Sequence, residues 1–499
     1  MKLLKVYISA FCMCSLSVLL NSCDDFLKEE PLDMKSSDQF WKTKADAESG
    51  VNALYFGGVP YLHNTDVGGG WTPKATMWGG IVSGLYVDKR KDRTFTTASE
   101  GCNFNIESFD DIAMKYWHEF YKGISRANFV IANIPTMTGV LDEATINNYV
   151  AQGKFFRAYG YFWLVKEFGG VPYISEPYTS TEGMYKERLS AEEVYKKIEA
   201  DLLDIVNGDA LPNKTFYDNG CYVTRAMAQT LLAQVYLQWA GAPLNGGTDY
   251  YGKAAQMALK VINDSPHELI HPNGTTDDLS SAYNVIKTTK SSAEIIYAKE
   301  YNYSDYSVGN SYACRSIGTD AFQWGVFHPG GDVLYNAYLP CDMLLNSYAS
   351  NDIRGHEKQF FFKKYTDAAG KTYTLNNAGN WAWFDENALI SGHDGDYNMP
   401  VFRFAEVLLI AAEGLARTNH EDNAVGGAKY YLNQVRKRAG LADETATGND
   451  LIQSILTERL HELPLEFKIW DDIRRTRLYP EASTESGKLK WTALASAQI

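Results

Sequence analysis

Aromatic side chains recur at helical spacing along residues 143–168. Tyr149, Phe156 and Trp163 lie seven residues apart, and further rings widen the same stripe. A helix with so broad an apolar face must be buried on more than one side. The pair Gly169-Gly170 then ends the pattern. We therefore expect a long helix packed between neighbours.

Other stretches of the chain show the same helical texture. Ser190 and Glu193 form a capping box, which predicts a helix from there to about residue 206. Apolar residues on one face predict further helices over 38–56, 111–134, 224–240, 250–263, 401–417, 424–438 and 449–463. Successive helices with short breaks favour a mostly α fold, with a tetratricopeptide-like scaffold of helical pairs.

The texture changes in the middle of the chain. Gly, Asn, Asp, Ser and aromatic residues dominate 271–398, and only Glu294–Glu300 indicates a short strand. This pattern predicts an irregular, loop-rich insertion laid over the helices. We expect a single domain over 37–499, in which the insertion separates a helical-repeat part, 37–270, from a C-terminal helical part, 399–499.

The N-terminus predicts export and lipid anchoring. Residues 1–22 begin with a positive charge and continue in an apolar run too short to cross a bilayer, as in a signal peptide. The run ends in Leu-Asn-Ser before Cys23, which resembles a bacterial lipobox, so we expect acylation of Cys23, for example with palmitate. Two or more acyl chains make a stable anchor. An ordinary secretory signal with a chance cysteine is the alternative.

Residues 23–36 are expected to form the acylated linker of the mature protein. Asp24 and Asp25 resemble acidic signals that send lipoproteins to the outer face of the cell, although they also suit a solvated linker.

The formal net charge of the chain is -14. An acidic surface disfavours nucleic acids and simple adhesion to anionic lipid. A neutral or cationic ligand fits this charge better.

The cysteines do not predict a metal site. Four remain besides the signal-segment pair and Cys23, and they are widely spaced: Cys102, Cys221, Cys314 and Cys341. Metal sites built from Cys or Cys and His use close spacings that this chain lacks. Export permits disulfides, but the sequence leaves their pairing open.

Several motifs together resemble one family. They are CDDFLKEEP (23–31), GKFFRAYGYFWLVKEFGGVPYI (153–174), FRFAEVLLIAAEGLAR (402–417), LNQVRKRAGL (432–441) and ERLHELPLEFKIWDDIRR (458–475). In this order they resemble the SusD/RagB family of outer-membrane nutrient-binding lipoproteins. Phe467 and Ile469 depart from the family pattern, where glycine and arginine are usual. Both departures lie in a structural motif and concern local packing.

The resemblance implies a fold, a function and a partner. It implies a SusD-like fold without a catalytic centre, anchored in the outer membrane and facing the exterior. The protein would bind an oligosaccharide or polysaccharide, or in some members a peptide, and deliver it to a SusC-like TonB-dependent transporter. The charges of the family motifs, among them Arg403, Glu406, Arg436 and Arg438, are interpreted as fixed ion pairs between helices, because charges in packed elements are usually paired.

Candidate ligand-binding residues lie in the glycine-rich connections. Sugars present apolar faces and a rim of hydroxyls, which suit a flat aromatic ring beside short polar side chains. The family builds its sites in the loop after the first helix and in the central insertion. The candidates there are Trp71, Trp78, Tyr86, Asp88, Arg90, Trp324, Phe327, Asp332, Trp381 and Trp383. Alternatively, these rings pin the loops onto the helices.

Two other classes of function stay open. A glycoside hydrolase needs two carboxylates about 5 to 9.5 Å apart, and an acidic chain offers many chance pairs. His393-Asp394-Gly395-Asp396 could suggest a metal loop, but it lacks calcium-loop spacing and is interpreted as a turn. A structural calcium is therefore unsupported. A scaffold that grips protein partners would bury the loop aromatics and bind no glycan.

Overall fold

The computed structural model describes most of the chain, in eight segments. These are residues 40–56, 80–87, 111–178, 180, 182–271, 277–306, 309–328 and 338–496. The predicted signal segment, the linker and Cys23 lie outside them. The domain boundaries proposed for 1–22 and 23–36 therefore stay predictions.

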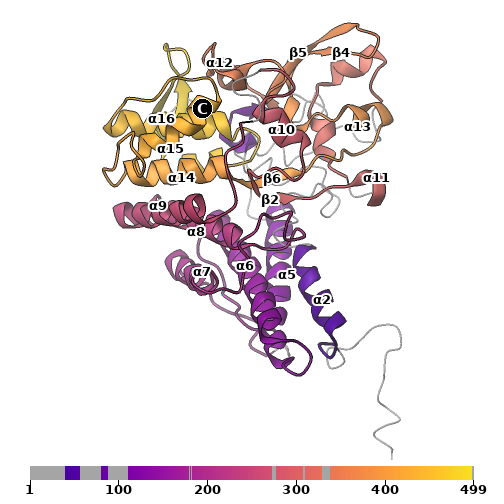
Figure 1. Ribbon diagram of the computed structural model, residues 1–499, viewed down its shortest axis with the longest axis vertical. Coiled ribbons are helices and arrows are strands. Elements are labelled where there is room, and N and C mark those ends of the chain that lie inside the picture. Colours follow the sequence, from indigo (N-terminus) through magenta and orange to yellow (C-terminus); the bar gives the residue numbers. More distant parts are fainter. Residues whose placement is uncertain are drawn as a thin grey trace, which may run out of the picture.

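Long helices stacked in successive pairs form the N-terminal part of the molecule (Figure 1). They are α2 (Lys44–Asn52), α5 (Asp111–Asn133), α6 (Glu143–Phe168), α7 (Ala191–Val206), α8 (Arg225–Ala240) and α9 (Gly247–Asp264). Each packs against the next from α5 to α9. The aromatic helix α6 lies in the middle and buries rings such as Phe155 and Tyr161 completely. The mostly helical, tetratricopeptide-like fold predicted from periodicity is confirmed.

Local capping sets where two of these helices begin. In α7 the Glu193 amide donates to Ser190 Oγ at 3.2 Å, and the Ser190 amide donates to Glu193 Oε2 at 2.9 Å, so the predicted capping box is confirmed. In α2 the same device joins Thr43 and Asp46. The first helix therefore starts at Lys44, and the prediction that it spans 38–56 is wrong at its start.

The C-terminal part is a second group of helices. They are α14 (Phe404–Ala416), α15 (Ala428–Arg438), α16 (Gly448–Glu462) and α17 (Ile469–Thr476), followed by the hairpin β7 (Leu478–Ala482) and β8 (Leu489–Ala493). Helix α14 lies along α9 and so joins the two parts (Figure 1). At Gly414 a Cβ atom would lie 2.5 Å from the Tyr251 carbonyl oxygen, so only glycine allows this close approach.

The central insertion has more regular structure than its composition indicates. Two of its strands pair with strands outside the insertion: β3 (Leu339–Pro340) with β1 (Tyr86–Val87), and β2 (Ile295–Lys299) with β6 (Met399–Arg403). The other two, β4 (Phe361–Thr366) and β5 (Thr372–Asn380), pair with each other, and all three ladders are antiparallel. Its short α-helices are α10 (Ala282–Thr288), α11 (Tyr303–Tyr306), α12 (Asp342–Asn346) and α13 (Glu386–Ser391). The predicted strand is confirmed as β2, but the β4–β5 hairpin was missed. The first residues of the predicted 401–417 helix belong to β6.

Two hydrophobic cores hold the described segments together. The larger runs from Ala47 to Trp491 and joins the N-terminal and C-terminal helices. A smaller core belongs to the insertion alone and is centred on Phe327, Phe362 and Phe384. Because an irregular segment cannot bury much backbone, this aromatic core is what gives the insertion a fixed shape.

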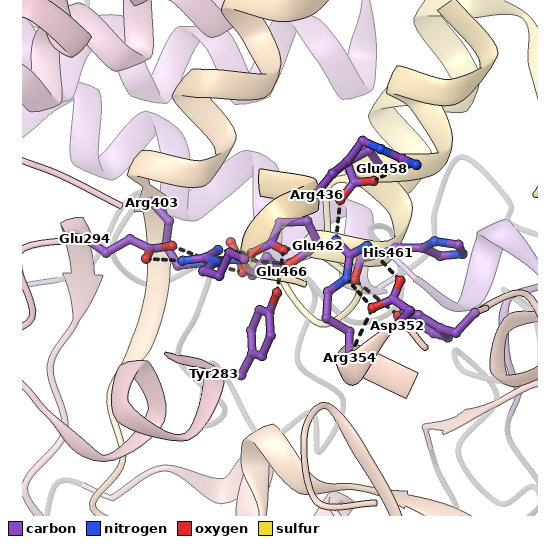
Figure 2. A network of polar contacts seen from close by, with 12 residues as sticks. Tyr283, Glu294, Asp352, Arg354, Arg403, Arg436, Glu458, His461, Glu462 and Glu466 are labelled. Atoms are coloured by element: carbon purple, nitrogen blue, oxygen red, sulfur yellow. Dashed lines mark hydrogen bonds and ion pairs between the residues drawn. The ribbon is translucent and has the colours of Figure 1, made fainter. Parts of the chain in front are cut away.

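Buried arginines and glutamates tie the insertion to the C-terminal helices (Figure 2). Glu462, at the end of α16, is fully buried and receives hydrogen bonds from Arg354, Arg403 and Arg438. Burial would raise the pKa of Glu462, but the three positive charges outweigh it and lower the pKa. Glu294, just before β2, binds Arg403 and Arg438 as well. The carboxylates thus hold guanidinium groups from three separate segments.

The predicted ion pairs are confirmed, with partners that the sequence did not identify. Arg403 binds Glu466 at 2.7 Å, whereas Glu406 binds Lys468 at 3.1 Å. Arg436 contacts Glu458 at 3.4 Å. In α17, two neighbouring arginines reach back to α6 and α14: Arg474 pairs with Glu167, and Arg475 pairs with Glu413. The charges of the terminal motif are therefore structural and join helices far apart in sequence.

Two further features bear on the sequence predictions. None of the described helices is long and apolar enough to cross a membrane.

Cys221 and Cys341 carry free thiols, and both are half-buried. Burial and the nearby Glu300 carboxylate raise the pKa of the Cys221 thiol to about 11. Cys102 lies outside the described segments.

Candidate ligand-binding surface

Half of the predicted ligand-binding residues lie outside the described segments. They are Trp71, Trp78, Asp88, Arg90 and Asp332. Their roles stay predictions. The remaining five are Tyr86, Trp324, Phe327, Trp381 and Trp383. The structure separates these five by exposure.

The expectation of exposed rings is wrong for Tyr86 and Phe327. Tyr86 is 1% exposed, because β1 pairs with β3 and its ring stacks on Tyr338 at 4.3 Å. Its hydroxyl donates to the Pro464 carbonyl oxygen. Phe327 is 2% exposed and packs between Tyr365 and Phe384 in the smaller core. Both rings hold connections in place, as the alternative interpretation requires.

The same expectation is wrong for Trp381 and Trp383. Trp381 is 9% exposed, stacks on Phe384 at 5.0 Å and donates from Nε1 to Asn284 Oδ1 at 2.7 Å. Trp383 is 4% exposed and contacts Tyr312 at 4.8 Å. Both lie in the short 3-10 turn after β5, which turns them inward. A tryptophan with a satisfied N–H in such a place is a core residue.

Trp324 is the predicted ring that keeps an open part. It ends a 3-10 helix (Thr319–Trp324), before Gly325 in a left-handed conformation, and it is half-buried. Its indole stacks on Tyr373 of β5 at 4.8 Å, with an interplanar angle of 21°. Tyr365 of β4 is the cross-strand partner of Tyr373, and its ring lies 6.2 Å from the indole and nearly parallel to it. Three rings from the hairpin and the 3-10 helix therefore form one aromatic stack, the Trp324 stack.

Polar groups fix the Trp324 stack from both sides. Tyr365 donates its hydroxyl to Glu386, and burial together with this bond raises the pKa of the Tyr365 phenol. Tyr373 donates its hydroxyl to Asp367 Oδ2 at 3.1 Å. Asp320, on the helix that carries Trp324, accepts from the Asn376 amide at 2.7 Å. The rings are therefore held in one orientation, and carboxylates lie along their edge.

A second aromatic and polar group was not predicted. Tyr303 in α11 stacks on His393 at 4.4 Å, nearly parallel, and Tyr306 in the same helix is 75% exposed. Asp396 accepts hydrogen bonds from the Tyr303 and Ser304 amides and from Ser304 Oγ. Burial alone would raise the pKa of Asp396, but these three hydrogen bonds outweigh the effect of burial, and the pKa is lowered.

These residues, which we call the α11 group, come from two segments about 90 residues apart, so the sequence of neither segment alone predicts the group. The available sequence signal was the pair Tyr303 and Tyr306, which lie beside Asn302 and Asp305. Of the predicted turn over 393–396, only His393 bends, directly after the turn at Gly392, whereas Gly395 forms an isolated antiparallel bridge with Asn310. In the described segments no group of three or more His, Cys, Asp or Glu side chains is placed to hold a metal ion.

Chemically, both groups suit a ligand with flat apolar faces and many hydroxyls. Fixed rings offer stacking area at low entropic cost, and carboxylate and amide oxygens accept hydrogen bonds from hydroxyl groups. The arrangement therefore supports recognition.

Two family models match separate parts of the chain. The model described as "SusD family" matches residues 323–490, and the model described as "Starch-binding associating with outer membrane" matches residues 81–237. Among curated proteins, the SusD-like protein P2 of Formosa agariphila is 27% identical over 494 residues, covering 95% of this chain and 91% of its own length.

Solved structures share the fold. A SusD superfamily protein from Parabacteroides distasonis superposes with a TM-score of 0.78 at 24% identity, over 91% of this chain and 92% of its own. Surface glycan-binding protein A from Bacteroides thetaiotaomicron, solved in complex with laminarihexaose, gives a TM-score of 0.66 at 22% identity, over 87% and 90%. At this level of identity the likeness concerns the fold.

Proposed function

Because the chain belongs to the SusD/RagB family, we propose that it binds an oligosaccharide or polysaccharide at the bacterial surface without cleaving it. The observation that carries the proposal is the Trp324 stack, in which hydrogen bonds and a hairpin hold a partly open indole flat. The structurally similar glycan-binding protein of B. thetaiotaomicron, solved with laminarihexaose, supports a saccharide as the ligand class.

The proposal includes a place and a partner. Acylation of Cys23 would anchor the chain in the outer membrane, and the acidic residues after it would direct it to the exterior. The family model described as associating with the outer membrane supports this location. A SusC-like TonB-dependent transporter would receive the glycan. Peptide-binding members of the family leave a peptide as the alternative ligand.

Alanine at Trp324 tests the proposal. Removing a stacking indole should weaken binding about tenfold, or ~1.4 kcal/mol, for any polysaccharide that the wild-type protein binds. Migration in polysaccharide affinity gels measures the change. Trp117→Ala is the matched control, because Trp117 is also half-buried but packs on Tyr121 and Phe168 of the N-terminal helices. Trp78→Ala tests the predicted loop in the same gels.

The outcomes separate binding from folding. Melting temperatures should stay within a few degrees for Trp324→Ala, because the indole is only partly packed. If every polysaccharide gel retards the Trp324→Ala protein as strongly as the Trp117→Ala protein, the Trp324 stack is not the binding surface. Release of free sugar by the purified wild-type protein would instead favour a glycoside hydrolase.

A further inference from the structure

Lys287 directs its ammonium group at aromatic rings. It lies in the last turn of α10, and Nζ is 4.1 Å from the centroid of the Trp381 ring and 4.9 Å from that of Tyr397. Phe384 lies 5.8 Å away. The side chain is half-buried, so a small reagent reaches it. A lysine in this position has exchanged much of its hydration for ring faces.

In the part of the chain that the structure describes, no carboxylate forms an ion pair with this lysine. Within the described segments Nζ forms no hydrogen bond or ion pair. The nearest acidic groups, Asp385 and Glu386, are engaged elsewhere: Asp385 accepts from the Ala388 and Asp396 amides, and Glu386 accepts from Tyr365. A second cation, Lys358, stands 5.3 Å from the same Trp381 ring and opposes a positive charge at Lys287.

The surroundings therefore favour the neutral amine. Burial is the largest effect, and it lowers the pKa of Lys287 to about 7 against the smaller opposing pull of the Asp385 and Glu386 carboxylates. The ring faces attract the ammonium, but a quadrupole replaces only part of the lost hydration. A desolvated lysine with a free electron pair at neutral pH is a nucleophile.

Lys287 also lines part of a small cavity. Its volume is about 50 Å³, and Lys287, Asn310, Trp383 and Asn398 are among the side chains that line it. Apolar groups such as Pro400 make up much of the remaining wall. The cavity admits a molecule of a few heavy atoms beside the Lys287 side chain.

We propose that Lys287 is a carbonyl-capture site, at which the ε-amine forms an imine with small aldehydes and with the open-chain end of reducing sugars. The nitrogen electron pair attacks the carbonyl carbon and gives a carbinolamine. Loss of the carbonyl oxygen as water, with the two amine protons, then leaves the C=N bond. The step needs no oxidant or reductant. It is independent of glycan binding at the Trp324 stack.

Reductive trapping tests the proposal on the full wild-type chain. The protein is treated at pH 7 with glycolaldehyde and sodium cyanoborohydride, and modified lysines are mapped by peptide mass spectrometry. Lys287 should react about tenfold faster than Lys358, because a large part of the Lys287 side chains carry a neutral amine at this pH. The advantage should shrink as the pH rises towards 10. Equal rates for the two lysines at pH 7 would overturn the proposal.

Two further arms identify the source of the aldehyde and exclude a labelling artefact. A reducing disaccharide replaces glycolaldehyde in one arm, with its alditol as the unreactive control. Modification of Lys287 by the disaccharide supports capture of chain ends, and modification by glycolaldehyde alone supports capture of small free aldehydes. In Lys287→Arg the fast phase of labelling should disappear while other lysines react as before. Persistence of the fast phase would also overturn the proposal.

Discussion

Lowering the pH from 7 to 5 should weaken this fold through one buried histidine. His461 in α16 is 2% exposed, and its ring stacks on Tyr348 at 4.3 Å. Ser347 Oγ donates to the Leu344 carbonyl at 2.7 Å, so it accepts from His461 Nε2–H at 2.8 Å. A second proton on the imidazole would place a positive charge in the network of Figure 2, which is already rich in arginine.

Burial, and then the positive charge of Arg354, lower the pKa of His461 to about 3, while Asp352 opposes the shift and Arg436 adds to it. In the unfolded chain the imidazole has a pKa of about 6.5. Between these values the unfolded state binds more protons, so stability is present above pH 6.5 and is lost as the pH falls towards 3. From pH 7 to 5 the loss from this group alone is about 2 kcal/mol.

Urea unfolding of wild type and His461→Gln at pH 7 and pH 5 measures the part of the stability loss that is due to His461. Glutamine keeps a donor for Ser347 but cannot be protonated. The variant should be less stable at pH 7 because of lost packing, yet it should lose about 2 kcal/mol less than wild type on going to pH 5. The exposed His328→Gln is the matched control and should behave as wild type. Equal losses in wild type and His461→Gln would refute the reasoning.

Two stability predictions follow from other parts of the fold. Glu462→Gln leaves three buried guanidinium groups short of a charge, and it should cost about 3–5 kcal/mol in urea unfolding, whereas the exposed Glu192→Gln should change stability by less than about 1 kcal/mol. A loss of unfolding free energy no larger for Glu462→Gln than for Glu192→Gln would contradict the inference that the buried network ties the insertion to the C-terminal helices. Ser190→Ala removes the cap of α7 and should cost about 1 kcal/mol, and Ser190→Asp should restore it. No recovery with aspartate would argue against capping.

Helices could be predicted from this sequence because their signals are local. The capping box at Ser190 and the glycines after Phe168 mark helix ends directly, and the observed bounds of α5, α6 and α7 follow them closely. The β4–β5 hairpin was missed because Asn and Gly in β5 weaken its strand pattern. Its register depends on packing against Phe327 and Trp324, which no local pattern contains.

The candidate site was predicted less well than the fold, for a related reason. The sequence placed aromatic residues in glycine-rich connections, but it did not say which face of each ring meets solvent. Trp381 and Trp324 were both candidates because both lie in such connections. Trp381 turned inward because Asn284 accepts from its indole N–H, and Trp324 stayed partly open because it ends a helix at the surface of the smaller core. Pairings over tens of residues, such as Tyr303 with His393, decide such outcomes.

The buried rings nevertheless explain how an irregular insertion can carry a binding surface. A stacking platform works only if its ring is already fixed before the ligand arrives, because ordering a side chain costs part of the binding free energy. Tyr365 and Tyr373 fix Trp324, and Phe327 and Phe384 fix Tyr365. Phe327, a predicted ligand contact that proved to be buried, thus supports the ring that stays partly open. Changes at the open edge of Trp324 should therefore alter ligand preference, whereas changes at Phe384 should loosen the whole stack and reduce affinity for every ligand together.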